Sequence, residues 1–418
     1  MSENRSDTCD MKVPTEIKMG ESNFDLTRVV SPLFIFFCMC PFLFPIPGLD
    51  TNMQMYACLF AILIILLNFR RFMQSVNDEL AFAGVLLCLL VATIVAFFTG
   101  FSISTFRGYF NHLSILVIPV ASYIILRTRG FEERLIKSII LIWFFVSVIQ
   151  IAFYRGFFAE YIGSPNWAST ARGVIGLASE PSFLGITCFY FLNLAKRFKS
   201  RRTLFFVLIT VMGVVLAQSA VGIVFIAAFW FAFMFEELNF RRGFLIFACL
   251  VAAGVLGYFF LSKFGSGTRL FALINTFLSS GLGDLYANDE SFRNRMNAVA
   301  RALNSSVDAY FLPQGFGSRI GSGYGGILCE IGFFSVIQMV VVSLGMARTF
   351  SKRSAQVVFF IAITLLLFSN TQIGNPQLLL VVGLNYGFYH QSCKANASQE
   401  SKVRSLFLRT RGEVAYHG

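Results

Sequence analysis

Residues 80–98 read LAFAGVLLCLLVATIVAFF, an uncharged run long enough to cross a hydrocarbon layer of roughly 30 Å as a helix. Similar runs recur along the 418-residue chain, which has a mean hydropathy of +0.69 and only 13% charged residues. A soluble domain of this size needs more polar side chains to cover its surface. Because backbone groups in lipid must bond within their own segment, the sequence predicts an all-α polytopic integral membrane protein.

These runs predict about twelve membrane spans. The spans form one transmembrane domain over 30–391, between an N-terminal tail at 1–29 and a C-terminal tail at 392–418. Two predicted outer loops, 154–180 and 262–325, are long, and long loops in compact proteins are often functional. The predicted spans are 30–48, 53–69, 80–98, 109–126, 135–153, 181–195, 203–218, 220–235, 243–261, 326–346, 355–369 and 376–391.

The basic residues predict the orientation. With both termini inside, 25 of the 34 Lys and Arg residues fall in inside segments and 9 fall outside, as the positive-inside rule requires. The formal net charge of +12 is then explained by membrane topology and by contact with anionic lipids. The basic residues are dispersed over separate short loops, so no nucleic-acid partner is expected.

Five of the nine outside basic residues lie between 263 and 326, which suggests an anionic ligand at the outer face. These five are Arg269, Arg293, Arg295, Arg301 and Arg319. Residues 290–304 predict an amphipathic helix, with Phe292, Met296, Val299 and Leu303 as an apolar stripe and Arg293, Asn297 and Arg301 on another face. The following LPQGFGSRIGSGYGG could place backbone N–H groups around an anion. A solvated helix face and a flexible loop are the alternative interpretations.

The other long loop contains Glu180-Pro181-Ser182, a sequence typical of a helix start. Glu180 would lie at the water–lipid boundary, with Arg172 eight residues before it. The alternative is that Glu180 only stabilises a helix N-terminus. Further polar residues are expected on the same face, and each could simply belong to a wet turn. They are Gln218 and Ser219, Arg107 and His112, and Asn370, Gln372 and Asn375.

Catalytic motifs of soluble enzymes are not found, and the chain has only three histidines, His112, His390 and His417. No metal-ligand spacing occurs, so neither a metal nor another cofactor is expected. If the chain is an enzyme, its acid–base group is a carboxylate or a tyrosine. The candidates are Glu180, Asp289, Glu290, Asp308 and Tyr324. Arginines would hold a diphosphate, because a planar guanidinium matches phosphate oxygens bidentately.

In these features the chain resembles the O-antigen polymerase (Wzy) family, within the O-antigen ligase and polymerase superfamily. The resemblance lies in Arg172 followed by GLASEPSFLG at 176–185, in AQSAVG at 217–222, and in the 290–301 helix followed by LPQGFGS at 312–318 and LCEIGFFSV at 328–336. It implies a GT-C-like glycosyltransferase of the bacterial inner membrane. Such an enzyme moves a growing glycan from undecaprenyl diphosphate onto another undecaprenyl diphosphate-linked repeat unit, in the periplasm and without metal.

The resemblance also implies site residues and partners. By the resemblance, Arg172 and the arginines of 290–301 would bind the donor diphosphate. The further substrate-binding candidates are predicted from their placement on the same outer face and not from the resemblance: Arg319, Arg107, Gln218 and Ser219. A Wzz-type co-polymerase that regulates chain length and a flippase are the implied partners.

Two alternatives stay open: an O-antigen ligase, and a lipid-linked glycan flippase or other transporter. Ligases of the superfamily typically carry a histidine after the corresponding glycine-rich stretch, whereas residues 113–389 contain none. Transporters usually show ionisable residues within their spans, whereas charged residues here are expected outside them.

Overall fold

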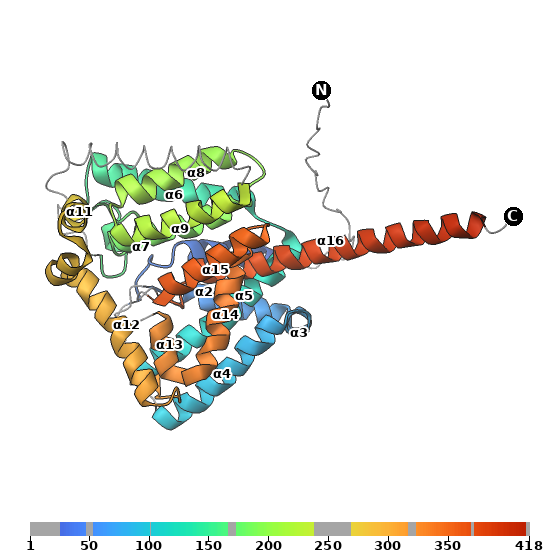
Figure 1. The fold of residues 1–418 in the computed structure, drawn as a ribbon, viewed down its shortest axis with the longest axis horizontal. Coiled ribbons are helices and arrows are strands. Elements are labelled where there is room, and N and C mark those ends of the chain that lie inside the picture. Colours follow the sequence, from blue (N-terminus) through green and yellow to red (C-terminus); the bar gives the residue numbers. More distant parts are fainter. Residues whose placement is uncertain are drawn as a thin grey trace.

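The computed structural model describes residues 26–46, 53–100, 102–165, 173–237, 269–316, 323–368 and 372–414. This part of the chain is all α, with no β-strand (Figure 1). Short 3₁₀ helices occupy Ala159–Tyr161 and Gly332–Phe334, and a π-helix occupies Met212–Leu216. The α-helices are α1 (Leu26–Met39), α2 (Tyr56–Leu67), α3 (Phe69–Asp78), α4 (Leu80–Thr99), α5 (Ile103–Arg129), α6 (Glu133–Ala152), α7 (Pro181–Ala195), α8 (Arg202–Val211), α9 (Ala220–Glu237), α11 (Arg269–Asn288), α12 (Glu290–Asp308), α13 (Tyr324–Ile331), α14 (Ser335–Ala347), α15 (Arg353–Phe368) and α16 (Pro376–Val414).

Eleven of the twelve predicted spans coincide with described helices, and the run at 243–261 lies outside the described residues. By length and composition, five described helices can cross a membrane, or six if α2 and α3, which meet at 97°, form one span. Four more apolar helices are shorter: α1, α7, Arg202–Leu216 and α15. The membrane character is therefore supported. The count of twelve and the GT-C-like class stay predictions.

Two helix boundaries differ from the predicted ones. The run at 30–48 is helical only to Met39, because Pro41 lacks an N–H and its ring excludes the preceding turn. At the other terminus, α16 does not end at 391 but continues to Val414, and Figure 1 shows it projecting from the bundle.

Helix α5 is the centre of the bundle and is buried continuously from Ser114 to Leu126. It packs against α2, α4 and α16. Helices α7 and α9 form another close pair, because Gly185 and Gly222 let the two backbones approach: a Cβ added to Gly222 would lie 2.5 Å from Gly185 Cα. Small residues at crossings of this kind are the usual way for membrane helices to pack.

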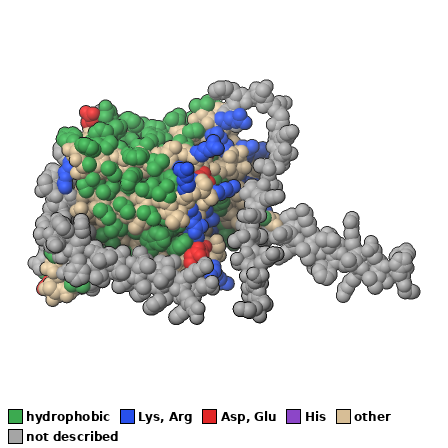
Figure 2. All heavy atoms as spheres, turned by 90° about the horizontal axis from the view of Figure 1, so that it is seen from above, with side chains coloured by type: hydrophobic (Ala, Val, Ile, Leu, Met, Phe, Trp, Pro, Cys, Tyr) green, Lys and Arg blue, Asp and Glu red, His purple; other side chains and the backbone are tan. Residues whose placement is uncertain are grey.

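The connections predicted to lie inside gather at one end of the bundle. Figure 2 shows Lys and Arg side chains concentrated toward the end from which α16 projects, beside a largely apolar surface. Ion pairs join these connections: Arg127 to Asp78 at 2.9 Å, Arg348 to Glu79 at 3.7 Å, and Lys196 to Glu236. Helices α11 and α12 lie at the opposite end in Figure 1. The described helices thus have a basic end and an opposite end, and the opposite end is called the outer end because the predicted orientation places it outside.

This arrangement generates a topology test. A reporter fused after Ser306 in α12 should show that this site lies in the periplasm. A reporter fused after Lys199 should show that this second site lies in the cytoplasm. The reason is that Lys199 lies at the basic end and α12 at the opposite end. Alkaline phosphatase and green fluorescent protein fusions measure the two sides. If both fusion sites reported the same side of the membrane, the predicted topology would be contradicted.

Candidate functional site

Two of the stretches that carry the family resemblance lie side by side at the outer end: residues 173–185 and residues 217–222. The Val174 N–H donates to the Leu216 carbonyl at 2.9 Å, and Gly185 packs on Gly222. Gln150 of α6 fixes the same loop: its amide nitrogen donates to the Gly176 carbonyl at 2.8 Å, and its oxygen accepts from the Gly176 N–H at 2.7 Å. A loop bonded from two directions holds the start of α7 in a defined place.

Glu180 occupies the position just before α7 and is half-buried, as predicted for a residue at the helix start. Its Oε2 accepts a hydrogen bond from the Ser182 hydroxyl at 3.0 Å, and it makes no capping bond to the helix backbone. The carboxylate therefore retains acceptor capacity for a proton or a hydroxyl group.

The adjoining turn gives Gln218 and Ser219 different roles. Ser219 is buried, and its hydroxyl accepts from the Gly222 N–H at 3.3 Å, so it caps α9. Gln218 is half-buried and has a φ of 47°, a left-handed conformation that non-glycine residues rarely adopt. The π-helix at Met212–Leu216 directly precedes this turn. Strained backbone and π-helical turns both concentrate at functional sites.

A second pair of stretches, 311–316 and 329–334, also forms one unit. The Gln314 N–H donates to the Cys329 carbonyl at 3.0 Å, the Gly315 N–H to the Glu330 carbonyl at 3.3 Å, and the Phe333 N–H to the Phe311 carbonyl at 2.9 Å. Gly315 has a φ of 86°, which explains a glycine at this bend. The start of the glycine-rich loop is thereby attached to α13.

Beneath this loop lies a buried polar network that the sequence prediction did not include. Glu330 of α13 and His112 of α5 are fully buried, and Glu330 Oε2 lies 3.0 Å from His112 Nε2. His112 Nδ1 bonds to Gln338 Oε1 of α14 at 3.0 Å, and Phe316 packs edge-on against the His112 ring. The sequence feature that could have indicated this network is Glu330, an ionisable residue inside the predicted span 326–346. The expectation that charged residues lie outside the spans is therefore wrong at this position.

Arg107 lies five residues before His112, at the outer start of α5. Ser102 caps this helix by accepting from the Thr105 N–H at 3.1 Å. The Arg107 side chain is half-buried, and its Nε is buried without a hydrogen-bond partner among the residues that the structure describes. Such a group is expected to bind an oxygen atom from another molecule or from water.

The predicted helix at 290–304 is confirmed as α12. It packs on α13 through small residues: Ala302 is buried against Gly325, and the Cys329 thiol donates to the Ala302 carbonyl at 3.6 Å. Met296 and Leu303 of the predicted apolar stripe remain 49% and 40% exposed. Met296 and Leu303 are therefore exposed enough to face lipid or to cover a cavity, while the small residues make the contact with α13.

Two arginines of α12 have guanidinium groups without carboxylate partners. Arg293 Nη1 donates to the Ala287 carbonyl at 2.9 Å, and Arg301 Nε donates to the Asn297 carbonyl at 3.3 Å. Neither arginine forms an ion pair with any described residue, whereas Arg295 has a partner. Arg301 is exposed and Arg293 is half-buried. This face of α12 can therefore bind an anion.

The remaining acid–base candidates differ in how exposed their side chains are to solvent or to a substrate. Glu290 and Asp308 are exposed at the two ends of α12, and Asp289 is half-buried. Tyr324 is fully buried, and its hydroxyl bonds to the Met339 carbonyl at 2.9 Å and to Ser343 at 2.7 Å. This placement does not favour Tyr324 as a base. Arg172 and Arg319 lie outside the described residues.

Within the described ranges, no three His, Cys, Asp or Glu side chains are grouped to hold a metal ion. Searches of protein-family models, curated proteins and solved structures found no match to this chain. Function must therefore be argued from the chain's own residues.

The buried network predicts a large effect of single substitutions. Glu330→Ala should lower the free energy of unfolding by about 3–5 kcal/mol, because it leaves the buried Nε2 of His112 without its partner. Removing both partners in His112→Leu/Glu330→Leu should be less damaging than the sum of the single changes. Unfolding in detergent micelles measures this, with Glu290→Ala as an exposed control on α12. Additive effects, or a Glu330→Ala protein as stable as the parent, would contradict the coupling.

Proposed function

We propose that this chain is a membrane glycosyltransferase that polymerises a surface polysaccharide of the O-antigen type. It would transfer the growing glycan from undecaprenyl diphosphate to a new undecaprenyl diphosphate-linked repeat unit, at the periplasmic face of the bacterial inner membrane. One observation carries the proposal: the stretches that resemble the polymerase family form two contacting pairs at the outer end. One pair presents Glu180, and α12, the helix that carries Arg293 and Arg301, packs on α13 in the other.

The arrangement supplies what this reaction requires. The donor contains a diphosphate, and Arg293, Arg301 and Arg107 offer charged donors that no described carboxylate neutralises. In the transfer, a hydroxyl oxygen of the acceptor sugar forms a bond to the anomeric carbon of the donor. The bond from that carbon to the diphosphate breaks, and undecaprenyl diphosphate leaves with the bonding electron pair. A carboxylate such as Glu180 would take the hydroxyl proton.

A ligase activity is less well supported. His112 does approach the glycine-rich loop through Phe316, but it is fully buried and both of its ring nitrogens are bonded. It is therefore poorly placed to bind an acceptor. The chain is expected to extend lipid-linked repeats rather than to transfer glycan to lipid A-core.

A flippase or transporter is the second candidate, and one observation favours it. Glu330 and His112 form an ionisable pair inside the bundle, and such pairs often mark transport pathways. Reconstitution separates the two functions. A polymerase forms a ladder of longer lipid-linked products from lipid-linked repeat units, whereas a transporter moves them across the bilayer without lengthening them. If the polymerase proposal holds, a flippase supplies the substrate and a Wzz-type co-polymerase sets chain length.

The arginines generate a direct test in proteoliposomes that contain undecaprenyl diphosphate-linked repeat units, without nucleotide or metal. Arg293→Ala and Arg301→Ala should each reduce the rate of ladder formation by about tenfold to a hundredfold, since a hydrogen bond to a charged group contributes roughly 1.5–3 kcal/mol. Lysine should restore activity poorly, because it cannot bind two phosphate oxygens in one plane. Arg202→Ala at the basic end is the control. Normal ladders from both α12 variants would remove the diphosphate assignment.

Glu180→Gln tests the proposed base, because it keeps the shape of the side chain and removes its charge. Polymerisation should slow by about a hundredfold or more, the usual contribution of a positioned base. Glu160→Gln, an exposed carboxylate of the same loop, is the matched control. The initial rate in proteoliposomes is the measurement. A normal rate for Glu180→Gln would leave Glu180 as a helix-start residue only.

A further inference from the structure

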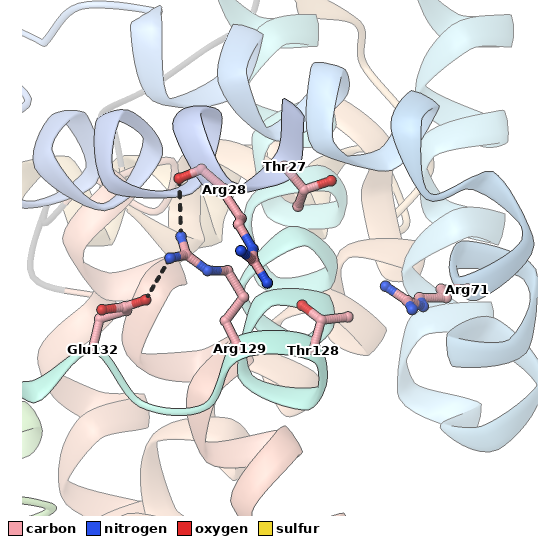
Figure 3. A pocket seen from close by; sticks show the side chains of 6 residues that line it. All are labelled: Thr27, Arg28, Arg71, Thr128, Arg129 and Glu132. Atoms are coloured by element: carbon pink, nitrogen blue, oxygen red, sulfur yellow. Dashed lines mark hydrogen bonds and ion pairs between the residues drawn. The ribbon is translucent and has the colours of Figure 1, made fainter. Parts of the chain in front are cut away.

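A recess at the basic end brings together three arginines from separate elements. It has a volume of about 440 Å³ and lies between the start of α1, helix α3, the end of α5 and the turn before α6 (Figure 3). Its lining residues are Thr27, Arg28, Arg71, Thr128, Arg129 and Glu132. The recess is remote from α12 and from the arginines of the proposed donor site, which lie at the other end of the bundle.

The recess carries an excess of two positive charges, since three arginines face one glutamate. Arg129 is held in place: its Nη1 donates to the Arg28 carbonyl at 3.1 Å, and its Nη2 lies 3.3 Å from Glu132. Arg71 donates only to the Asn68 amide oxygen at 3.0 Å, and neither Arg28 nor Arg71 forms an ion pair with a described residue. In Figure 3 the side chains of Arg28 and Arg71 point into the space between α1, α3 and α5.

Helix α3 places this recess at the membrane surface. It turns by 97° from α2, so it runs across the direction of the span, and its Phe69 and Met73 are 57% and 46% exposed. Arg70 and Arg71 directly follow Phe69, so the short helix α3 carries both apolar and basic side chains. An amphipathic basic helix of this kind lies in the interface between headgroups and acyl chains.

An apolar surface leads from the recess toward the bilayer. Leu26, Val29 and Leu33 recur along one face of α1 and are 44%, 50% and 43% exposed, next to Arg28. On α2, the neighbouring helix, Leu66 is 65% exposed close to the bend. A ligand with a charged head in the recess would therefore have hydrocarbon surface beside it for its tails.

We propose that this recess binds the phosphate of an anionic phospholipid of the cytoplasmic leaflet. Arg28 and Arg71 supply the charged donors and Arg129, fixed by Glu132, supplies a third. The acyl chains lie along the exposed faces of α1 and α2. Basic pockets between membrane helices on the cytoplasmic side are known to bind such headgroups. A free phosphate ion shares the headgroup chemistry but makes no use of the apolar surface.

Native mass spectrometry of the purified full-length chain tests the site. Phosphatidylglycerol and cardiolipin should remain bound in preference to phosphatidylethanolamine. Arg28→Gln/Arg71→Gln should reduce that preference by about thirtyfold, which is roughly the combined effect of two basic side chains at a membrane surface. Arg28→Lys/Arg71→Lys should retain most of it. Arg202→Gln/Arg353→Gln, which removes two charges elsewhere at the basic end, should leave it unchanged.

Three results would overturn the proposal. The first is an unchanged lipid preference in Arg28→Gln/Arg71→Gln. The second is an equal loss in the Arg202→Gln/Arg353→Gln control, which would show only a general effect of surface charge. The third is thermal stabilisation by inorganic phosphate as strong as that by phosphatidylglycerol at equal phosphate concentration, which would indicate a site for a free anion. Because lipid binding is the readout, the outcome is independent of glycan polymerisation.

Discussion

The whole architecture depends on the requirement that backbone N–H and C=O groups in a bilayer find partners within their own segment. It explains why the described residues form helices and why irregular backbone is displaced to the two ends, as at 196–201 at the basic end and 311–316 at the outer end. Without a hydrophobic driving force between helices, close packing decides which helices pair. The Gly185–Gly222 contact joins α7 to α9, and the contact of Gly383 with Pro119 joins α16 to the central helix α5.

At the basic end, polar side chains connect the helices that packing has brought together. Arg197 lies two residues after the end of α7 and is half-buried, and desolvation lowers the pKa of its guanidinium to about 10, so it stays charged at neutral pH. It donates to the Arg348 carbonyl at 2.7 Å and to Asn385 Oδ1 at 3.2 Å. Asn385 in turn donates to Thr349 Oγ1 at 2.8 Å. These bonds connect α7, α14 and α16 at the basic end of the bundle.

The sequence predicted those features that depend on composition within one segment. The apolar runs located the helices, Pro181 located the start of α7, and the apolar and polar spacing of 290–304 located α12. Contacts between segments far apart in the chain could not be predicted in this way. Glu330 and His112 are separated by 218 residues, and nothing near either residue indicates the other. The small-residue contact of Ala302 with Gly325 was missed because the amphipathic pattern draws attention to larger apolar side chains.

Arginines without ion pairs to described residues lie at both ends of the molecule, Arg28 and Arg71 at one and Arg293 and Arg301 at the other, but only the second pair opposes the predicted distribution of charge. At the basic end, where positive charge is favoured, Arg127, Arg129 and Arg348 form ion pairs with carboxylates. At the outer end, which the predicted orientation makes a side where positive charge is disfavoured, Arg293 and Arg301 have only backbone carbonyls as partners among the described residues. A charge that opposes the topology signal and stabilises no carboxylate contributes little to the fold. Its retention is most simply explained by an anionic ligand, and a diphosphate has the charge and the oxygen geometry that two guanidinium groups can bind.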